Sequence, residues 1–185
     1  NFIMSETRFK FKKCELLPNE GSSLDEKYEL LGGGPIVDYY ESIDSPTVSM
    51  NITFIDIDQV ISRKGISGGE HIDLTIEIDG FDDFKLTKKK HNLMLNSVRN
   101  VITETNKQVA TLEFVSVESI INETARVNKK FTGNVSQTVS ELLVSYKKGI
   151  QTKKKLDKHD ATNSYSFIGN LKRPFDTIQW LCPKS

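Results

Sequence analysis

Cysteine is scarce in this chain, and long apolar runs are absent. Cys14 and Cys182 are the two cysteines among 185 residues. They stand far apart and match no metal-binding or redox spacing, so we expect two unpaired thiols in a reducing compartment, with a disulfide between them as the less favoured alternative. No run of about 18 apolar residues occurs, which predicts no membrane-spanning segment. The first ten residues lack a basic leader followed by an apolar core, so no signal peptide is expected.

Net charge is also absent, because 25 Lys and Arg balance 25 Asp and Glu. The balance is uneven along the chain. Residues 1–86 hold 8 basic and 17 acidic residues, a net of −9, and residues 87–185 hold 17 and 8, a net of +9. If folding keeps this separation, an acidic and a basic face would favour head-to-tail contacts between copies or with stacked partners. The alternative is two halves whose surfaces differ without a defined patch.

Strand patterns are abundant from about Thr7 to Glu118. In residues 48–54 apolar and polar residues alternate strictly, so one face of the expected strand is apolar. Residues 71–78 alternate in the same way, and the following Asp79-Gly80 is typical of a hairpin turn.

A second hairpin is predicted from residues 93–105 and 108–119, joined across residues 104–108. Several short strands, each with one apolar side, predict an antiparallel sheet that closes on itself or packs on a partner sheet.

The hydrophobic period becomes helical after Val117. Residues 119–127 predict a short helix with Ser119 as its N-cap, and residues 134–149 a longer one with Asn134 as N-cap and Gly149 as C-cap. Residues 164–170 predict a short strand, and residues 173–182 a helix with Pro174 in its first turn. We therefore predict a mainly β protein with an α+β C-terminal part. Residues 1–118 would form an antiparallel β-barrel or roll, and residues 119–185 a helix-containing region that begins an inserted or second domain.

Asp56 and Asp58 stand two residues apart at the end of the strand expected at 48–54, so their carboxylates lie on the same side. Paired carboxylates can act as acid and base or hold a metal, provided that a second element supplies a base or further ligands. The sequence identifies no such element. We therefore interpret both residues as the solvated end of a strand.

Two motifs match ligand-binding loops only in part. Residues 79–84 (DGFDDF) place Phe81 where a calcium loop needs an oxygen ligand, so we interpret them as a hairpin turn. Residues 31–35 (LGGGP) lack the Lys-Ser/Thr pair and the strand-to-helix context of a phosphate loop. We interpret this triple glycine as a flexible joint.

The three histidines, His71, His91 and His159, share no ligand spacing with one another or with the cysteines, so no zinc site is predicted. His159, Asp160 and Cys182 are the residue types of a cysteine-protease site. However, Cys182 falls at an apolar helix end, where thiols usually pack inertly. We predict no catalytic, metal-binding or cofactor-binding residue, and no enzyme.

Two lysine runs, Lys88–Lys90 and Lys153–Lys155, are the basic clusters. Nucleic-acid binders combine such runs with aromatic residues that stack on bases, and none is interleaved here. We interpret the lysines as solvated, with contact to an acidic partner surface as the alternative.

The order of several segments resembles baseplate hub subunits of contractile-tailed phages (myoviruses), especially those of marine phages. The segments that carry this resemblance are YYESIDSPTVSMNITFIDID, GGEHIDLTI, a long stretch from Asn96 to Leu143, and RPFDTIQWLC. Residues 129–143 resemble the helix through which the hub chain leaves its first barrel, and residues 172–182 resemble the helix that opens the next element. The matching motifs are structural rather than catalytic.

This resemblance implies a structural virion protein that is assembled in the host cytoplasm and located in the tail baseplate. Hub subunits of this kind form a trimeric ring that joins the tail tube to the central spike, contacts other baseplate proteins and lets DNA pass as cargo. Family hub chains also carry a second barrel, which we do not find in this sequence.

Two other classes of function stay open. A β-sandwich that binds glycans or a receptor could present Tyr39 and Tyr40 for stacking on sugar rings. A baseplate-associated wall hydrolase would need a carboxylate pair or a metal set that the sequence does not supply.

Overall fold

The structure is a computed structural model that describes residues 9–104 and 107–185. The chain divides into two compact units, residues 1–116 and residues 117–185, and each has its own hydrophobic core. The division lies two residues before the boundary expected at residue 118. Antiparallel strands dominate the first unit and short helices the second, which confirms the predicted fold class.

The first unit consists of short strands with two brief helical segments between them. Their bounds are β1 (Phe9–Leu17), β2 (Tyr28–Glu29), the 3-10 turn η1 (Leu31–Gly33), β3 (Ile36–Tyr40), β4 (Ser49–Asp56), α1 (Val60–Lys64), β5 (His71–Ile78), β6 (Phe84–Leu86), β7 (Leu93–Glu104) and β8 (Lys107–Ser116).

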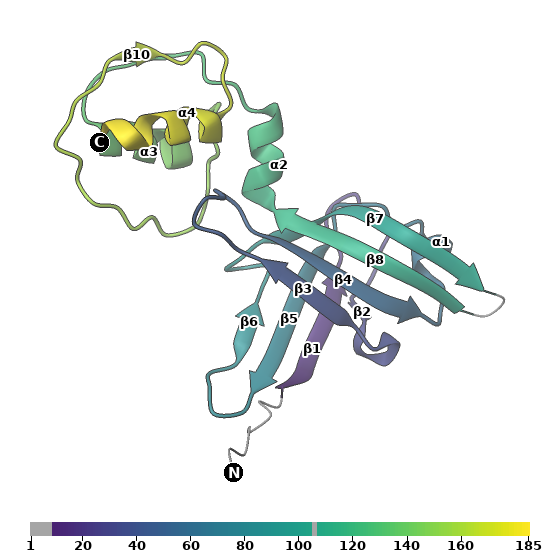
Figure 1. The fold of residues 1–185 in the computed structure, drawn as a ribbon. Helices are drawn as coiled ribbons and strands as arrows, with labels where there is room; N and C mark the ends of the chain where they lie inside the picture. The colour runs from purple at the N-terminus through teal and green to yellow at the C-terminus, as the bar shows by residue number, and fades with distance from the viewer. Residues whose placement is uncertain (1–8, 105–106) are drawn as a thin grey trace. The chain divides into compact units, whose positions relative to one another are not determined.

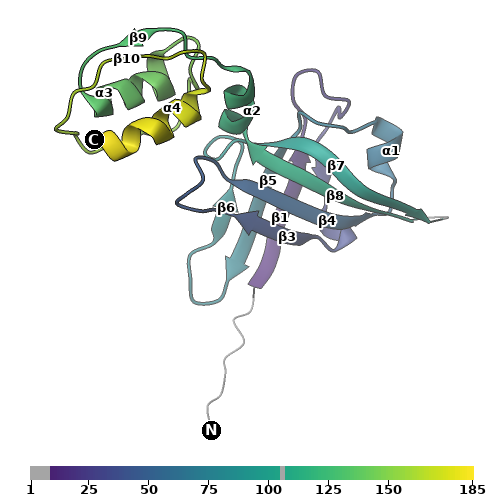
Figure 2. The same cartoon turned by 45° about the horizontal axis from the view of Figure 1, so that its top comes forward.

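These strands form one antiparallel sheet in the order β2-β1-β5-β7-β8-β4-β3, with β6 beside β5. In Figures 1 and 2, the layer of β3, β4, β8 and β7 crosses over β1 and β5. The two layers join where His71 of β5 pairs with Met94 of β7, the one pair recorded between these strands. Among the described strands no ladder joins β3 to β6, but Tyr39 and Phe84 pack across that gap with ring centroids 5.5 Å apart. The sheet is therefore a roll that side chains close.

The alternation of apolar residues places the core inside this roll. Met50, Ile52 and Phe54 of β4 are buried, and Leu112 and Phe114 of β8 meet them from the neighbouring strand. Full burial of side chains of this size contributes about 1.5–3 kcal/mol each to folding. The predicted period of two in β4 and β5 is confirmed.

Both predicted hairpins are confirmed. β5 pairs with β6 across a turn in which Gly80 has a φ of 81°. β7 pairs with β8, and residues 105 and 106 at its turn lie outside the described residues, as do residues 7 and 8 before β1.

The triple glycine has a packing role that the prediction of a flexible joint missed. A Cβ atom on Gly33 would lie 2.3 Å from the carbonyl oxygen of Ile55, so only glycine lets η1 approach β4 this closely.

The second unit combines short helices with a two-stranded ribbon. Its elements are α2 (Val117–Thr124), β9 (Lys130–Phe131), α3 (Val135–Ser140), the π-helical turn η2 (Glu141–Ser145), β10 (Phe167–Ile168), α4 (Pro174–Leu181) and the 3-10 turn η3 (Cys182–Lys184). Asn134 caps α3 by accepting a hydrogen bond from the Ser136 N–H at 2.8 Å, and Pro174 is in the first turn of α4, as predicted.

Two predicted helix ends in this unit are wrong. Helix α2 begins at Val117 directly after β8, so Ser119 lies inside its first turn and does not cap it. Gly149 is not a C-cap, because the helical segment ends at Ser145 and Tyr146 is its C-cap. The chain then folds back, and the Ile150 N–H donates to the Leu142 carbonyl at 3.0 Å. A Cβ on Gly149 would lie 2.2 Å from that same carbonyl oxygen, so close approach explains the glycine.

Candidate functional site

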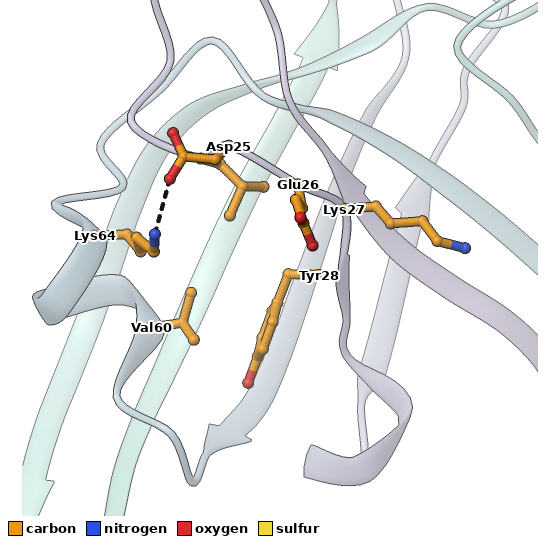
Figure 3. A pocket seen from close by; sticks show the side chains of 7 residues that line it. Asp25, Glu26, Lys27, Tyr28, Val60 and Lys64 are labelled. Carbon is orange, nitrogen blue, oxygen red and sulfur yellow. Dashed lines mark hydrogen bonds and ion pairs between the residues drawn. The ribbon is translucent and has the colours of Figure 1, made fainter.

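A pocket of about 280 Å³ lies in the first unit, between the segment that leads into β2 and helix α1. Its lining residues are Leu24, Asp25, Glu26, Lys27, Tyr28, Val60 and Lys64. Figure 3 shows the ring of Tyr28 and the side chain of Val60 below the ion pair of Asp25 and Lys64, whose atoms are 2.9 Å apart. Lys27 points away from the pocket and pairs with Glu15 at 2.9 Å.

Asp56 supports α1, the helix that lines this pocket. The side chain is fully buried, and its two oxygens accept hydrogen bonds from the N–H groups of Val60 and Ile61, each at 2.9 Å. These N–H groups at the start of α1 lack partners within the helix, so a carboxylate is a favourable acceptor for them. The prediction that Asp56 is solvated is therefore wrong, whereas Asp58 is exposed as predicted.

Tyr28 links the pocket to both acids. Its hydroxyl lies 3.5 Å from Asp56 Oδ1 and 3.4 Å from Asp58 Oδ2. Burial, together with the two carboxylates, raises the pKa of Tyr28 to about 12. The phenol therefore stays protonated near neutral pH and donates a hydrogen bond. Three of the charged residues that line the pocket are already in ion pairs, Asp25 with Lys64 and Lys27 with Glu15.

A charged network covers the outer face of β1 and β5. Lys13 Nζ lies between Glu15 at 3.1 Å and Asp73 at 3.0 Å. The hydrogen bond from Lys27 outweighs the effect of burial and, with Lys13, lowers the pKa of Glu15. These contacts connect β1, β5 and the segment before β2, so the charges stabilise the sheet.

His71 lies on the same face and is almost completely buried. Burial and the nearby charge of Lys88 lower the pKa of its imidazole. Within the described ranges, no three side chains of His, Cys, Asp or Glu are grouped so that they could hold a metal ion.

The two cysteines occupy opposite environments, and both are free. Cys14 is fully buried in the core of the roll, and burial raises the pKa of its thiol to about 12. Cys182 is exposed, which corrects the expectation of an inert packed thiol. Leu181 occupies the buried position at the end of α4, and the next residue turns outward. His159 and Asp160, the other members of the protease-like set, are exposed in the connector.

Tyr39 and Tyr40 do not form a paired surface. Successive residues of a strand point to opposite faces. Tyr39 packs inward against Phe84, and Tyr40 points outward with 53% of its surface exposed.

Each lysine run includes a residue that contacts an acidic side chain of its own unit. The Lys88 N–H donates to Asp73 at 2.9 Å, and Lys154 pairs with the buried Glu118 at 2.9 Å. The remaining lysines of both runs are exposed.

An apolar row crosses the outer face of β3, β4, β8 and β7. Ile55 is opposite Val109, and Val109 is opposite Ile102 on the next strand. Ile36 of β3 is opposite Thr53, and therefore diagonal to Ile55 on the same face. The isoleucines Ile36, Ile55 and Ile102 are 64%, 41% and 62% exposed.

Sequence reasoning missed the structural role of Asp56 and the outward apolar row. A signal for the first was present, because an acid shortly before an apolar pair is typical of a helix start. The row was hidden, because its members come from four strands whose register no local pattern determines.

Neither the known protein-family models nor the curated proteins include a match to this sequence. Among the described residues, none of the helices has the length and apolar character needed to cross a membrane. Structural evidence on function therefore comes from the surfaces of the two units.

Proposed function

We propose that this chain is a structural protein of the phage tail tip, a baseplate hub subunit that joins the tail tube to the central spike. This function is supported by the order of the sequence segments that resemble such hubs. The observation that carries it is the outward-facing apolar row of the antiparallel roll, in which Ile36, Ile55 and Ile102 are exposed and Val109 is half-buried.

Such a row is costly in an isolated protein. Contiguous exposed apolar patches on soluble proteins usually mark interaction surfaces, because covering them removes apolar area from water. The row ends at β3, which pairs with β4 alone among the described strands. An unpaired strand edge also favours contact with another chain. A ring of like subunits, seated between tube and spike, would cover both features.

The function proposed is mechanical. Subunit interfaces would hold the ring together until sheath contraction drives tube and spike through the host envelope, and DNA would pass through the bore. Acidic side chains on the first unit would keep that DNA from binding, because like charges repel. Asp56 takes no part in this, since it is buried beneath α1.

The glycan-binding alternative has less support. It requires aromatic side chains presented together, but Tyr39 packs into the roll and leaves Tyr40 alone on the outer face.

Immunogold electron microscopy of virions tests the proposed function. Antibodies raised against the purified chain should place gold at the tail tip of contractile-tailed particles. Gold on the capsid or the tail fibres would overturn the proposal. So would the absence of gold from particles whose tail tube is labelled by a control antibody.

A further inference from the structure

The two units carry opposite net charges. Residues 1–116 contain 13 Lys and Arg and 19 Asp and Glu, a net of −6, whereas residues 117–185 contain 12 and 6, a net of +6. The charge separation seen along the sequence is therefore also a separation between compact units. Each copy of the chain presents both an acidic and a basic body to its neighbours.

The acidic unit has a distinct surface at residues 36–44, which we call the β3 strip. Exposed apolar and acidic side chains alternate along it: Ile36, Asp38, Tyr40, Glu41, Ile43 and Asp44. Ile43 is fully exposed, and none of the three acids forms an ion pair with any described residue. The strip therefore combines apolar area, negative charge and a strand edge that no described strand pairs with.

The basic unit has a surface of the complementary kind on its β9–β10 ribbon. One face of the ribbon packs inward, where Phe131 and Phe167 stack with centroids 5.3 Å apart. Lys130 and Ile168 are paired across the two strands, and both are exposed. Leu171 and Lys172, three and four residues after Ile168, are also exposed.

We propose that the β3 strip of one copy binds the β9–β10 ribbon of a second copy, head to tail. Lysines of the ribbon would meet the unpaired acids of the strip, and its exposed leucine and isoleucine would cover the apolar side chains between those acids. Opposite electrostatic potentials on two surfaces steer their association and determine its register. The proposal rests on the proposed function in one respect, the choice of a second copy as the occupant.

The charges favour this contact over a symmetric one. Two β3 strips placed against each other would bring Asp38, Glu41 and Asp44 of both copies together, and like-charge contacts of this kind cost several kcal/mol. A contact between unlike surfaces leaves one free strip and one free ribbon on every dimer. Such contacts close into rings or extend into filaments, depending on the rotation between subunits.

Paired charge reversals test the contact directly. The strip variant carries Asp38→Lys and Asp44→Lys, and the ribbon variant carries Lys130→Glu and Lys172→Glu. Sedimentation velocity of the full chain over a concentration series at low salt measures association. Each variant alone should associate more weakly than the wild type by a factor of about ten or more, equivalent to about 1.4 kcal/mol. The mixture should recover association, because each reversed surface then meets a reversed partner and the native pair also remains.

Two further variants control for the change in net charge. Glu20→Lys with Asp82→Lys matches the charge change of the strip variant, and Lys89→Glu with Lys153→Glu matches that of the ribbon variant. These residues are exposed and lie outside both surfaces, so association should remain at the wild-type level. Circular dichroism of every variant verifies that the fold is retained.

Three outcomes would overturn the inference: a wild-type chain that is monomeric at every concentration, variants that associate as well as the wild type, or a mixture that does not recover. None of these changes the immunogold result. Gold at the tail tip with failed complementation would leave the proposed function standing and reject this contact alone. Recovered complementation with gold elsewhere would support the contact and reject the tail-tip function.

Discussion

Among the described residues, seventeen apolar side chains are buried in the first unit, whereas seven are buried in the second. The first core comes from strands whose apolar residues alternate along the sequence. The second core gathers single residues from elements of two to eight residues, such as Phe131, Val135 and Leu181. A small unit buries a smaller fraction of its surface, so it depends more on individual contacts than a large one does.

Polar and aromatic contacts supply what the small core lacks. Asn122 accepts a hydrogen bond from the Phe175 N–H at 2.9 Å and so holds the start of α4 against α2. Trp180 packs edge-to-face on Tyr165 and Phe167, with centroids 5.5 Å and 5.3 Å away. The first unit is therefore stabilised mainly by the alternating apolar residues of its strands, and the second by individual hydrogen bonds and aromatic contacts.

Removing one aromatic ring from each core should give the largest difference between the two units in loss of stability. Phe114 is fully buried in the large core, so Phe114→Ala should destabilise the first unit by about 3–5 kcal/mol. Phe131→Ala should cost the second unit an amount near the lower end of that range, because half-buried neighbours can relax into the space.

Two probes distinguish these losses during urea unfolding. Hydrogen exchange of the β4 and β8 amides at increasing urea follows the sheet, and the fluorescence of Trp180, the single tryptophan, follows the second core. An equal or larger loss for Phe131→Ala would show that the small core is as tightly packed as the large one.

The next largest loss of stability should come from removing a polar contact in the first unit. Asp56→Ala would leave the Val60 and Ile61 N–H groups without their acceptor, and we expect a loss of about 2–4 kcal/mol in the free energy of unfolding. Asp58→Ala removes an exposed carboxylate and should change stability by about 0.5 kcal/mol or less. Urea titration of both variants measures the difference. Similar small effects for both would mean that Asp56 contributes no more than a solvated acid does.

The sequence predicts the strands of the roll well, because period two records directly which face of a strand is buried. The strands at residues 48–54 and 71–78 could be predicted without knowing which strands they pair with. Helix starts with a local chemical cause were also predictable, since the Asn134 cap and the proline at position 174 act within one turn.

The predictions that were wrong concern residues whose role depends on segments distant in the sequence. Asp56 is buried because α1 folds over it, and Gly149 is needed because residue 150 returns to Leu142. The outer apolar row exists only once four strands are in register. Local patterns carry no record of such contacts, so the candidate surfaces emerged from the structure.

The stability of the second unit should depend on pH, to a smaller extent, through the partly buried ion pair of Glu118 and Lys154. Burial alone would raise the pKa of Glu118, but the hydrogen bonds from Lys154 and Thr152 outweigh it, and the net pKa is lowered. A carboxyl whose pKa is lower in the folded state stabilises that state fully above its unfolded pKa, near 4.5, and loses this contribution as pH falls below it.

Glu118→Gln cannot take up that proton. We therefore expect the variant to be less stable than the wild type at pH 7, and the gap to narrow at pH 3, where the carboxyl of the unfolded wild type is protonated. Urea titrations followed by Trp180 fluorescence at both pH values measure this gap. Glu123→Gln is the matched control, because its ion pair with Arg173 is exposed and such pairs contribute about 0–1 kcal/mol. A gap for Glu118→Gln that stays constant with pH would mean that packing around Glu118, rather than its charge, stabilises the second unit.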